Sequence, residues 1–350
     1  MIIGDLPTPA LLLDRDVFEA NLRRMADFAA RAGKKLRPHA KAHKCVEIAR
    51  RQIGMGAVGV CVATVNEAEL MVRSGIADVL LTSPIADRLK CERVAALGGA
   101  VAVVVDHAEQ VELYAGTRAE LDVLIDLDVG DHRTGVAPGE PALELARLIR
   151  SKPNLTFTGL QAYSVRASHM ADRAEFSTET LHHASTTKQL LESSGIEVRE
   201  ITGASTGSYS EDASLPYITE LQAGSYALMD VAYARIGRKE FGHALTVLAT
   251  VVSANHQDRV TVDAGFKAFA TDRTFGPEVQ GLEGARFEWA GDEFGYVFAD
   301  RARCRIELGD RLRFIPPHCD PNVNLYDRIY VCRGNKVEDV WSVMDRYYAR

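Results

Sequence analysis

A cluster of basic side chains lies within ten residues near the amino terminus. Residues 36–45 read Leu-Arg-Pro-His-Ala-Lys-Ala-His-Lys-Cys. Pro38 disfavours a helical conformation at the residue before it, so an extended backbone is expected here. Alternate side chains of an extended segment share a face, which would place His39, Lys41 and His43 together. Lys41 is therefore the candidate for an amine in a pocket, and a solvated basic turn is the simpler alternative.

Two later segments are rich in glycine and hydroxyl groups. Residues 201–209 read Ile-Thr-Gly-Ala-Ser-Thr-Gly-Ser-Tyr, and residues 222–226 read Gln-Ala-Gly-Ser-Tyr. Backbone N–H groups and hydroxyls of such loops can bind a phosphate, as the loops after the last two strands of many barrels do. A lysine that faces a phosphate site can form a Schiff base with pyridoxal 5′-phosphate. We therefore predict a pyridoxal-phosphate site with Lys41, rather than Lys44, as its lysine.

Other polar side chains follow predicted strands. Gln161 and Tyr163 share one face at the end of a strand, although Tyr163 could equally be a core residue. Arg133 lies in a glycine-flanked loop, where it could pair with Asp128 or reach an oxygen of the cofactor or substrate. Both interpretations of Arg133 carry equal weight.

A further segment could bind a metal ion. Residues 316–321 read Pro-Pro-His-Cys-Asp-Pro, so His318 and Asp320 would lie on one side of an extended chain. An imidazole and a carboxylate can be two ligands of a divalent cation, with the remaining positions open to water or substrate. A simple hydrogen-bonded His–Asp pair is the alternative.

The elements that must position these residues follow a repeating pattern. Short apolar runs, typical of parallel strands buried on both faces, alternate with helical patterns such as 17–32, 65–74 and 87–96. The predicted strands are 35–41, 57–62, 78–81, 100–105, 121–127, 156–161, 197–202 and 218–222. Eight such units predict a TIM (β/α)8 barrel. A doubly wound fold would need a G-x-G-x-x-G turn after the first strand, and the sequence has none there.

The pattern changes after residue 242. Turn residues now separate segments rich in β-branched and aromatic residues. These predicted strands are 247–253, 259–263, 303–308, 311–315, 328–333 and 336–341. We predict an α/β protein with a pyridoxal-phosphate-binding barrel at 1–240 and an all-β domain at 241–350 that carries the metal site.

Composition restricts the function classes. The 350 residues are 47% hydrophobic and 25% charged, as in an ordinary globular protein. A net charge of −7 argues against a nucleic-acid partner, whose phosphates attract a basic surface. No apolar run reaches the roughly 18 residues of a membrane span, and no signal pattern is present, so a cytoplasmic protein is expected. Six cysteines without a C-x-x-C pair indicate neither a disulfide framework nor a zinc ribbon.

Several motifs together resemble the D-threonine aldolase and D-serine dehydratase family. They lie at residues 7–14, 36–44, 128–135, 160–163, 222–226, 263–267 and 317–320. The resemblance implies an alanine-racemase-like fold, in which a pyridoxal-phosphate barrel joins a β-domain and a homodimer builds the active site. Two positions depart from the family pattern, because Val165 stands where the family has glycine and Phe294 where it has histidine.

The resemblance also implies roles for particular residues. Lys41 would carry the cofactor, and His169 or a metal-bound water would be the base. The other cofactor-binding residues would be Arg133, Gln161, Tyr163, Thr206, Gly207, Gly224, Ser225 and Tyr226. His318 and Asp320 would bind the metal. D-Serine dehydratases have His-x-Cys at this position and use zinc, whereas the harder oxygen ligand of Asp320 favours manganese or magnesium and thus the aldolase branch.

The implied activity is that of a lyase. A D-3-hydroxy amino acid resembling D-threonine or 3-hydroxy-D-aspartate would be cleaved to glycine and an aldehyde, which is glyoxylate for hydroxyaspartate. The alternative is a dehydratase that converts D-serine or D-threo-3-hydroxyaspartate to a 2-oxo acid and ammonia. A racemase would not need His318 and Asp320, and a carrier of pyridoxal phosphate would not need the second domain.

Overall fold

The computed structural model describes residues 1–170, 172–299 and 305–344. Contacts between residues divide the chain into two compact units. The barrel unit comprises Met25–Lys41 and Val46–Gly224, and the β unit comprises Met1–Arg24, Ala42–Cys45 and the described residues from Ser225 onward. Each unit has its own sheet.

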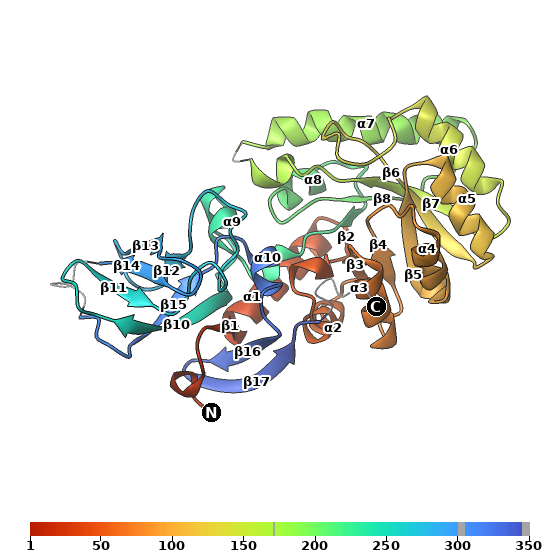
Figure 1. The fold of residues 1–350 in the computed structure, drawn as a ribbon. Coiled ribbons are helices and arrows are strands. Elements are labelled where there is room, and N and C mark those ends of the chain that lie inside the picture. The colour runs from red at the N-terminus through yellow and green to blue at the C-terminus, as the bar shows by residue number, and fades with distance from the viewer. Residues whose placement is uncertain (171, 300–304, 345–350) are drawn as a thin grey trace. The chain divides into compact units, whose positions relative to one another are not determined.

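Eight parallel strands form the barrel (Figure 1). They are β2 (Lys35–Leu36), β3 (Val60–Val62), β4 (Val79–Leu81), β5 (Val101–Val105), β6 (Leu121–Asp126), β7 (Leu155–Ala162), β8 (Glu200–Gly203) and β9 (Glu220–Leu221). Their order is β2-β9-β8-β7-β6-β5-β4-β3. A bridge between His39 and Cys61, with the amide of Cys61 donating to the Pro38 carbonyl at 2.9 Å, joins the first and last strands of this order. The predicted barrel is thereby confirmed.

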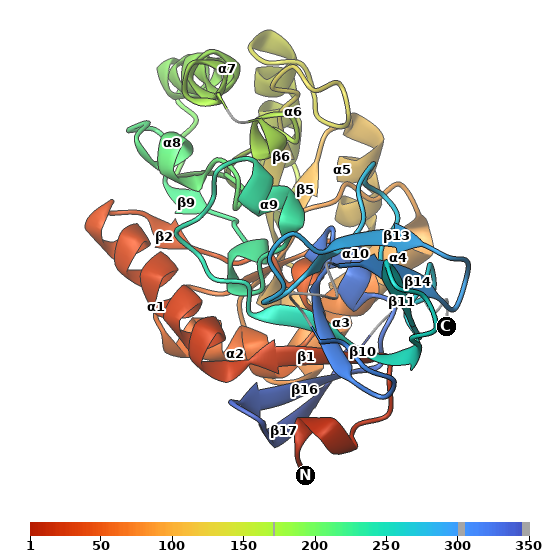
Figure 2. The same ribbon diagram turned by 90° about the vertical axis from the view of Figure 1, so that its left-hand side faces the viewer.

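Helices follow the strands and cover the outside of the barrel. They are α2 (Val46–Gly54), α3 (Val65–Arg73), α4 (Arg88–Ala95), α5 (Ala108–Thr117), α6 (Glu140–Arg150), α7 (Ala174–Ser193) and α8 (Tyr209–Ala213), preceded by α1 (Arg15–Arg31). The hydroxyl of Thr64 caps α3 and the carboxylate of Asp87 caps α4, as their sequence positions favour. In both ribbon views α6 and α7 lie side by side (Figure 2).

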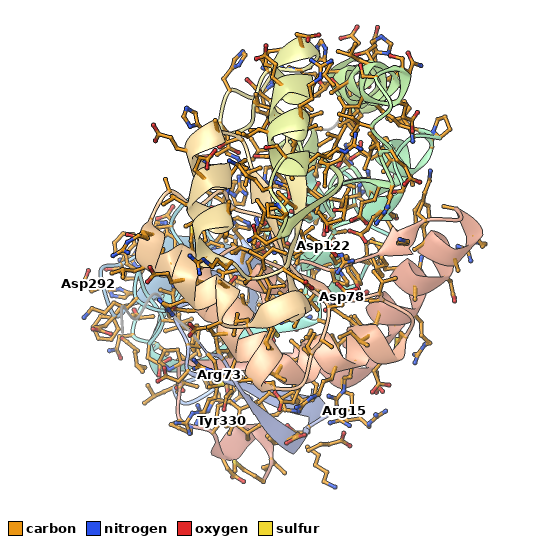
Figure 3. The ribbon with its side chains drawn as sticks, turned by 90° about the vertical axis from the view of Figure 1, so that its right-hand side faces the viewer. Arg15, Arg73, Asp78, Asp122, Asp292 and Tyr330 are labelled. Carbon is orange, nitrogen blue, oxygen red and sulfur yellow. The ribbon has the colours of Figure 1, made fainter. Side chains whose placement is uncertain are left out.

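The barrel interior is apolar between the neighbouring strands β3 to β6. Cys61, Leu80, Val104 and Leu124 come from β3, β4, β5 and β6 and form one buried cluster. Polar side chains occur where these strands begin, such as Asp78 before β4 and Asp122 in β6 (Figure 3). The apolar layer leaves the carboxyl ends of the strands for chemistry.

The β unit contains the second sheet. Its order is β13-β14-β11-β10-β1-β16-β17, and β15 pairs with β10 and β12. The strands are β1 (Ala10–Asp14), β10 (Leu245–Ser253), β11 (Arg259–Val262), β12 (Glu278–Val279), β13 (Arg286–Trp289), β14 (Gly295–Phe298), β15 (Arg311–Ile315), β16 (Arg328–Arg333) and β17 (Lys336–Ser342). Two short helices, α9 (Val231–Arg235) and α10 (Cys319–Val323), belong to the same unit.

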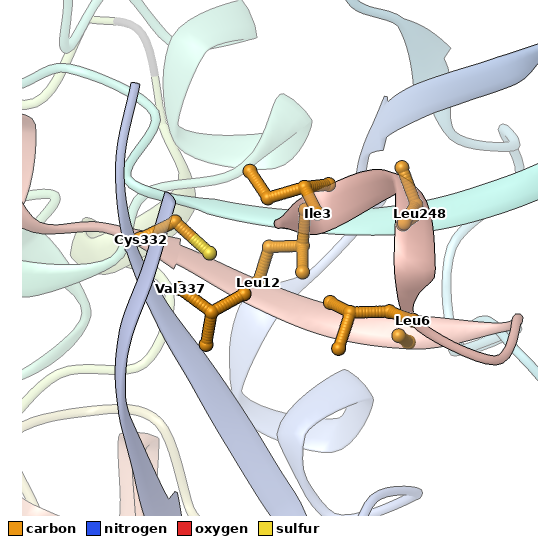
Figure 4. Packing of buried hydrophobic residues seen from close by; sticks show 7 residues of the cluster. Ile3, Leu6, Leu12, Leu248, Cys332 and Val337 are labelled. Carbon is orange, nitrogen blue, oxygen red and sulfur yellow. The ribbon is translucent and has the colours of Figure 1, made fainter. Parts of the chain in front are cut away.

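The amino-terminal strand is a central strand of this sheet. β1 pairs antiparallel with β10 and parallel with β16, and Leu12 packs against Ile3, Leu248 and Val337 (Figure 4). The sequence predicts a domain of residues 1–240, whereas contacts place Met1–Arg24 with the carboxy-terminal strands. The difference arises because strand pairing of this kind joins segments that are far apart in the chain, which a local pattern does not report.

Three other expectations about the elements need correction. The strand predicted at 35–41 ends at Leu36, and a 3-10 turn occupies Ala40–Ala42. Of the strand predicted at 303–308, the first two residues lie outside the described residues and the other four are not in a strand. The strands β12, β13 and β14 were not predicted, because segments of two to four residues are too short to give a clear pattern.

Across the described ranges, no helix combines the length and apolar character required to span a bilayer.

Candidate active site

A pocket of about 340 Å³ opens at the carboxyl ends of the barrel strands. It is lined by His39, Lys41, Ala63, Thr82, Ser83, Pro84, Arg133, Thr134, Gln161, Tyr163 and Gln222. Each of these residues ends a strand or lies in the segment that follows one. This is the end of a TIM barrel at which active sites are found.

Lys41 reaches the pocket from the 3-10 turn that follows β2. Its side chain is half-buried, and it forms no hydrogen bond or ion pair with any residue that the structure describes. The extended backbone expected here is wrong, and with it the shared face of three basic residues. His39 does line the pocket, but His43 is completely buried, and its Nδ1 accepts a hydrogen bond from the Cys45 amide at 3.1 Å.

The remaining basic residues of this segment have other positions. Arg37 is buried and donates through Nε to Glu220 at 3.0 Å, and its Nη1 pairs with Asp78. The backbone of Lys44 has a φ of 48°, and its carbonyl accepts a hydrogen bond from Met344. Neither residue lines the pocket, so the basic cluster of the sequence is dispersed in the fold.

Arg133 contributes the second cation of the pocket. Its guanidinium lies 5.1 Å from the centre of the Tyr163 ring, a cation–π distance. Asp128 accepts hydrogen bonds from the Gly130 amide, from the His132 amide and, at 2.6 Å, from Nδ1 of the His132 ring. Because Asp128 is engaged with these neighbours, the structure favours the interpretation in which Arg133 faces the pocket.

The loop that carries Arg133 is fixed by two buried or half-buried carboxylates. Thr134 donates its hydroxyl to Asp126 at 2.8 Å, and the amide of Gly135 donates to Asp106 at 2.9 Å. Burial raises the pKa of Asp126 to about 6, while hydrogen bonds from Gln161 and Thr134 limit the rise. Asp106 raises this pKa further, and Arg133 lowers it.

Gln161 and Gln222 form a hydrogen-bonded pair across the barrel mouth. Gln161 donates through Nε2 to the Thr82 carbonyl at 3.0 Å and to Asp126 at 2.8 Å. Gln222 donates through Nε2 to Gln161 Oε1 at 3.2 Å and to Thr202 Oγ1 at 3.0 Å. Both amides are nearly completely buried, so their orientation is set by these partners.

The residues predicted to bind a phosphate lie in two loops with close backbone contacts. A Cβ at Gly207 would lie 1.8 Å from the Ser168 carbonyl oxygen, and a Cβ at Gly224 would lie 2.4 Å from that of His39. Glycine is therefore required at both positions. Among the described residues, the pocket lining includes neither glycine and not Thr206, which is buried beside Gly207.

Ser225 and Tyr226 belong to the β unit. The hydroxyl of Ser225 donates to Asp320 Oδ1 at 2.7 Å, which connects a predicted phosphate ligand with a predicted metal ligand. Tyr226 is buried, and its ring centre lies 5.7 Å from that of Phe241. The predicted cofactor residues are thus divided between the two units.

His318 and Asp320 stand at the start of α10, after β15. His318 Nδ1 lies 2.7 Å from Asp272 Oδ2 and 3.3 Å from Arg273 Nη2. Cys319 lies between these two residues, and its amide donates a hydrogen bond to the buried carboxylate of Asp230 at 2.8 Å. This bond fixes the backbone between His318 and Asp320. Burial raises the pKa of Asp230, and His318 opposes this rise.

The predicted metal ligands do not form part of a larger ligand cluster. Within the described ranges, no group of three or more His, Cys, Asp and Glu side chains is arranged to hold a metal ion. His318 and Asp320 therefore remain a two-residue candidate, with Asp272 as the hydrogen-bond partner of the imidazole.

His169 lies outside the pocket lining. It ends the 3-10 turn Ala167–His169, next to Ser168, whose hydroxyl donates to Tyr163 at 3.1 Å.

The structure also shows where the two residues that depart from the family pattern lie. Val165, in the loop after β7, donates its amide to Asp131 in the loop after β6. Phe294 is 46% exposed in the β unit.

Sequence reasoning did not single out Thr82, Ser83, Pro84, Thr134 and Gln222 as site residues. A usable signal was present, because each ends a predicted strand or lies in the loop that follows it, where barrel sites form.

Comparisons with known proteins cover nearly the whole chain. Residues 13–231 match the family described as alanine racemase, N-terminal domain, and residues 244–332 match the putative serine dehydratase domain. The chain is 40% identical to a D-threonine aldolase of Arthrobacter sp., over 99% of this chain and 95% of the relative. It is 36% identical to a 3-hydroxy-D-aspartate aldolase of Paracoccus denitrificans, over 98% and 93%.

A dehydratase and a solved structure complete the comparison. The chain is 30% identical to a D-threo-3-hydroxyaspartate dehydratase of Delftia sp., over 89% of this chain and 90% of the relative. The crystal structure of a D-threonine aldolase from Filomicrobium marinum superposes with a TM-score of 0.94 at 37% identity, over 97% and 96% of the two chains.

Proposed function

The chain belongs to the D-threonine aldolase and D-serine dehydratase family, and on this premise we propose that it is an aldolase for D-3-hydroxy amino acids. The products would be glycine and an aldehyde, with pyridoxal phosphate and a divalent metal as cofactors. The relatives with 36% to 40% identity are aldolases, and the dehydratase is more distant at 30%. A D-threonine-like or a 3-hydroxy-D-aspartate-like substrate fits this proposal.

One observation carries the proposal. Lys41 presents an amine without a partner among the described residues, in a pocket at the carboxyl ends of the barrel strands. A lysine used only for structure is normally paired or fully solvated. The unpaired amine in a lined pocket instead has the environment of a covalent attachment site.

The residues of the pocket fit pyridoxal phosphate, which the family implies. Lys41 would hold its aldehyde carbon, and Arg133, Gln161 and Tyr163 would supply a cation, an amide and a phenol from the pocket lining. Thr206, Gly207, Gly224, Ser225 and Tyr226 would hold its phosphate. When bound, this cofactor accepts the electrons of a bond broken at the α-carbon of an attached amino acid.

The donor atoms of the residues around α10 are of the kind that bind a hard divalent cation. Nδ1 of His318 meets a carboxylate, so this nitrogen carries the proton of the neutral ring and Nε2 keeps a lone pair. Asp320 adds an oxygen ligand, which favours manganese or magnesium over zinc. A bound divalent cation lowers the pKa of a hydroxyl that it coordinates.

The chain's own side chains would then orient and deprotonate the substrate. Arg133 offers a fixed positive charge for a carboxylate, which suits either substrate. His39 donates through Nε2 to Thr82, because the Thr82 hydroxyl donates to the Val62 carbonyl at 3.0 Å. His169 lies outside the pocket lining, and its proposed role as the base for the β-hydroxyl proton rests on the family resemblance. A His169→Ala variant with unchanged activity would refute that role.

Product analysis tests the proposed function. The purified protein is incubated with pyridoxal phosphate and Mn²⁺, and D-threonine, D-3-phenylserine, D-threo-3-hydroxyaspartate and D-serine are offered separately. Glycine with an aldehyde, lost in Lys41→Ala and on addition of EDTA but retained in Lys35→Ala, is the expected result. A 2-oxo acid with ammonia would instead identify a dehydratase. Neither product from any substrate would refute both lyase activities.

We also propose that the protein is a cytoplasmic homodimer with neither a nucleic-acid nor a membrane partner. The family resemblance supports the homodimer, and the net charge of −7 supports the absence of nucleic acid. Sedimentation of the loaded enzyme should give twice the chain mass of 38.3 kDa. A monomer that is fully active would refute the proposed assembly.

A further inference from the structure

The hydrogen bonds at the barrel mouth determine the orientation of one buried amide. The two atoms that lie near Gln161 on one side are a carbonyl oxygen of Thr82 and a carboxylate oxygen of Asp126. Both can only accept, so Gln161 must direct its NH₂ group to them. Its carbonyl oxygen must then face Gln222.

The orientation of the Gln222 amide is fixed by partners on both sides. Gln161 Oε1 can only accept, so Gln222 must donate to it. Thr202 gives its single hydroxyl proton to Glu220 at 2.8 Å, and it therefore also accepts from Gln222. Arg37 donates to the same Glu220 oxygen and holds it in place. Both donor positions of Gln222 are used within the protein.

One consequence concerns the pocket. Gln222 Oε1 has no hydrogen-bond partner among the residues that the structure describes, although only 3% of Gln222 is exposed and the residue lines the pocket. Asp126 and Glu220 are the carboxylates at the two ends of this hydrogen-bond network, and they are 4% and 0% exposed. Asp126 accepts hydrogen bonds from Gln161 and Thr134, and Glu220 accepts from Thr202 and Arg37, so both buried carboxylates are held by the side chains that they orient.

We propose that Asp126 and Glu220 are positioning residues that act through Gln161 and Thr202 to hold the carbonyl oxygen of Gln222 toward the pocket. There it accepts a hydrogen bond from an N–H or O–H group of the bound ligand. A ligand with only acceptors at this point would leave two oxygens facing each other and is selected against. The proposal deepens the proposed function and rests on it for the identity of the probes.

Two pairs of variants distinguish a positioning role of Asp126 and Thr202 from a purely structural role. Thr202→Val removes the hydroxyl that connects Gln222 with Glu220, and Thr202→Ser retains it. Asp126→Leu removes both acceptors, whereas Asp126→Asn keeps an oxygen that can accept from Gln161. Asp122→Leu, at an exposed residue near the start of the same strand, is the matched control (Figure 3).

The first measurement uses pyridoxal phosphate and D-threonine as probes. We expect Thr202→Val, Asp126→Leu and Gln222→Met to raise either the Kd of pyridoxal phosphate or the KM of D-threonine about tenfold, as loss of a buried hydrogen bond does. Thr202→Ser, Asp126→Asn and Asp122→Leu should stay within about threefold of the wild type. Unchanged Kd and KM in all three disrupting variants, or no rescue by Thr202→Ser, would overturn the proposal.

The second measurement needs no ligand and no activity. In the cofactor-free protein, the side-chain amide protons of Gln161 and Gln222, assigned by substitution, should exchange with solvent far more slowly than those of the exposed Gln257. Thr202→Val should accelerate the exchange of Gln222. Exchange of Gln222 as fast as that of Gln257 overturns the proposal, even where lyase activity is present. Slow exchange in a chain that shows no lyase activity would refute the proposed function and leave the amide orientation supported.

Discussion

Lys41 differs from other lysines of the barrel unit in its surroundings. Lys152 pairs with Glu112 at 2.5 Å and Lys188 pairs with Glu192 at 3.0 Å, both at the surface. Lys41 has neither such a partner among the described residues nor full exposure to water. The difference supports the proposal that Lys41 is the nucleophilic amine of the pocket.

Replacement of Lys41 should separate cofactor attachment from folding. Lys41→Ala should abolish the visible absorbance of the bound cofactor and reduce turnover on the order of a thousandfold or more, because the nucleophile is removed. Lys35→Ala, at an exposed position of the same segment, should behave as the wild type. Absorption spectra and turnover of both variants check this, and a Lys41→Ala protein with wild-type absorbance would contradict it.

Asp126 should make stability depend on pH in a defined direction. Burial raises its pKa from 3.8 to about 6 in the folded protein, with Asp106 and Arg133 as its charged neighbours. Its contribution to stability is complete below pH 4 and is lost as the pH rises through 6, because the folded state holds the proton more tightly than the unfolded state.

Asp126→Asn should remove this pH dependence. Relative to the wild type, the variant should gain free energy of unfolding between pH 4 and 7, by at most about 3 kcal/mol for a shift of this size. Urea unfolding at several pH values measures the difference, with Asp122→Asn as the control. A difference that stays constant over this range would show that Asp126 ionises normally.

At the scale of elements, the loop after β9 must approach the segment that carries Lys41. Gly224 lies so close to His39 that a Cβ would meet its carbonyl oxygen at 2.4 Å and its Cβ at 3.1 Å. The backbone around Lys41 and the loop after Gln222 therefore fix each other. The placement of the amine depends on this contact.

A methyl group at this contact should disturb both elements. Gly224→Ala should lower the free energy of unfolding by about 1–3 kcal/mol, as overpacking does, and weaken the binding of pyridoxal phosphate. Gly116→Ala in α5 is the control, since nothing lies within 4 Å of the added Cβ there. Urea unfolding and cofactor titration of both variants test this, and equal behaviour of the two would refute the role of the close contact.

At the scale of the whole molecule, the amino terminus completes a sheet made from the carboxy-terminal third. β1 lies between β10 and β16, and its Leu12 is 1% exposed in the core of that sheet. The β unit therefore needs segments from both ends of the chain. A cut near residue 240 would not release two complete folding units.

Truncation of Leu12 measures this dependence. Leu12→Ala should reduce the free energy of unfolding by about 2–5 kcal/mol, the cost of a cavity in a packed core. Leu308→Ala, at a residue of the same unit that is 70% exposed, should change it by less than about 0.5 kcal/mol. Chemical unfolding followed by the fluorescence of Trp289 and Trp341 reports on this unit, and similar values for both variants would contradict the structural role of β1.

The sequence by itself determined the architecture and indicated a candidate for the reactive amine. Apolar runs such as Val101–Val105 predicted parallel strands, because burial on both faces leaves a signature in the residues themselves. Their number and alternation with helices led to the barrel, and the barrel rule placed Lys41, Gln161 and Tyr163 at strand ends. The structure brings all three to one pocket.

Only the tertiary structure decided which neighbours these residues have. It buries His43, directs Ser225 to Asp320, adds Thr82 and Gln222 to the pocket, and places β1 among carboxy-terminal strands. Local patterns report burial and backbone conformation, but contacts between distant segments depend on packing of the entire chain. The orientation of the Gln222 amide is the extreme case, since residues from five separate segments determine it.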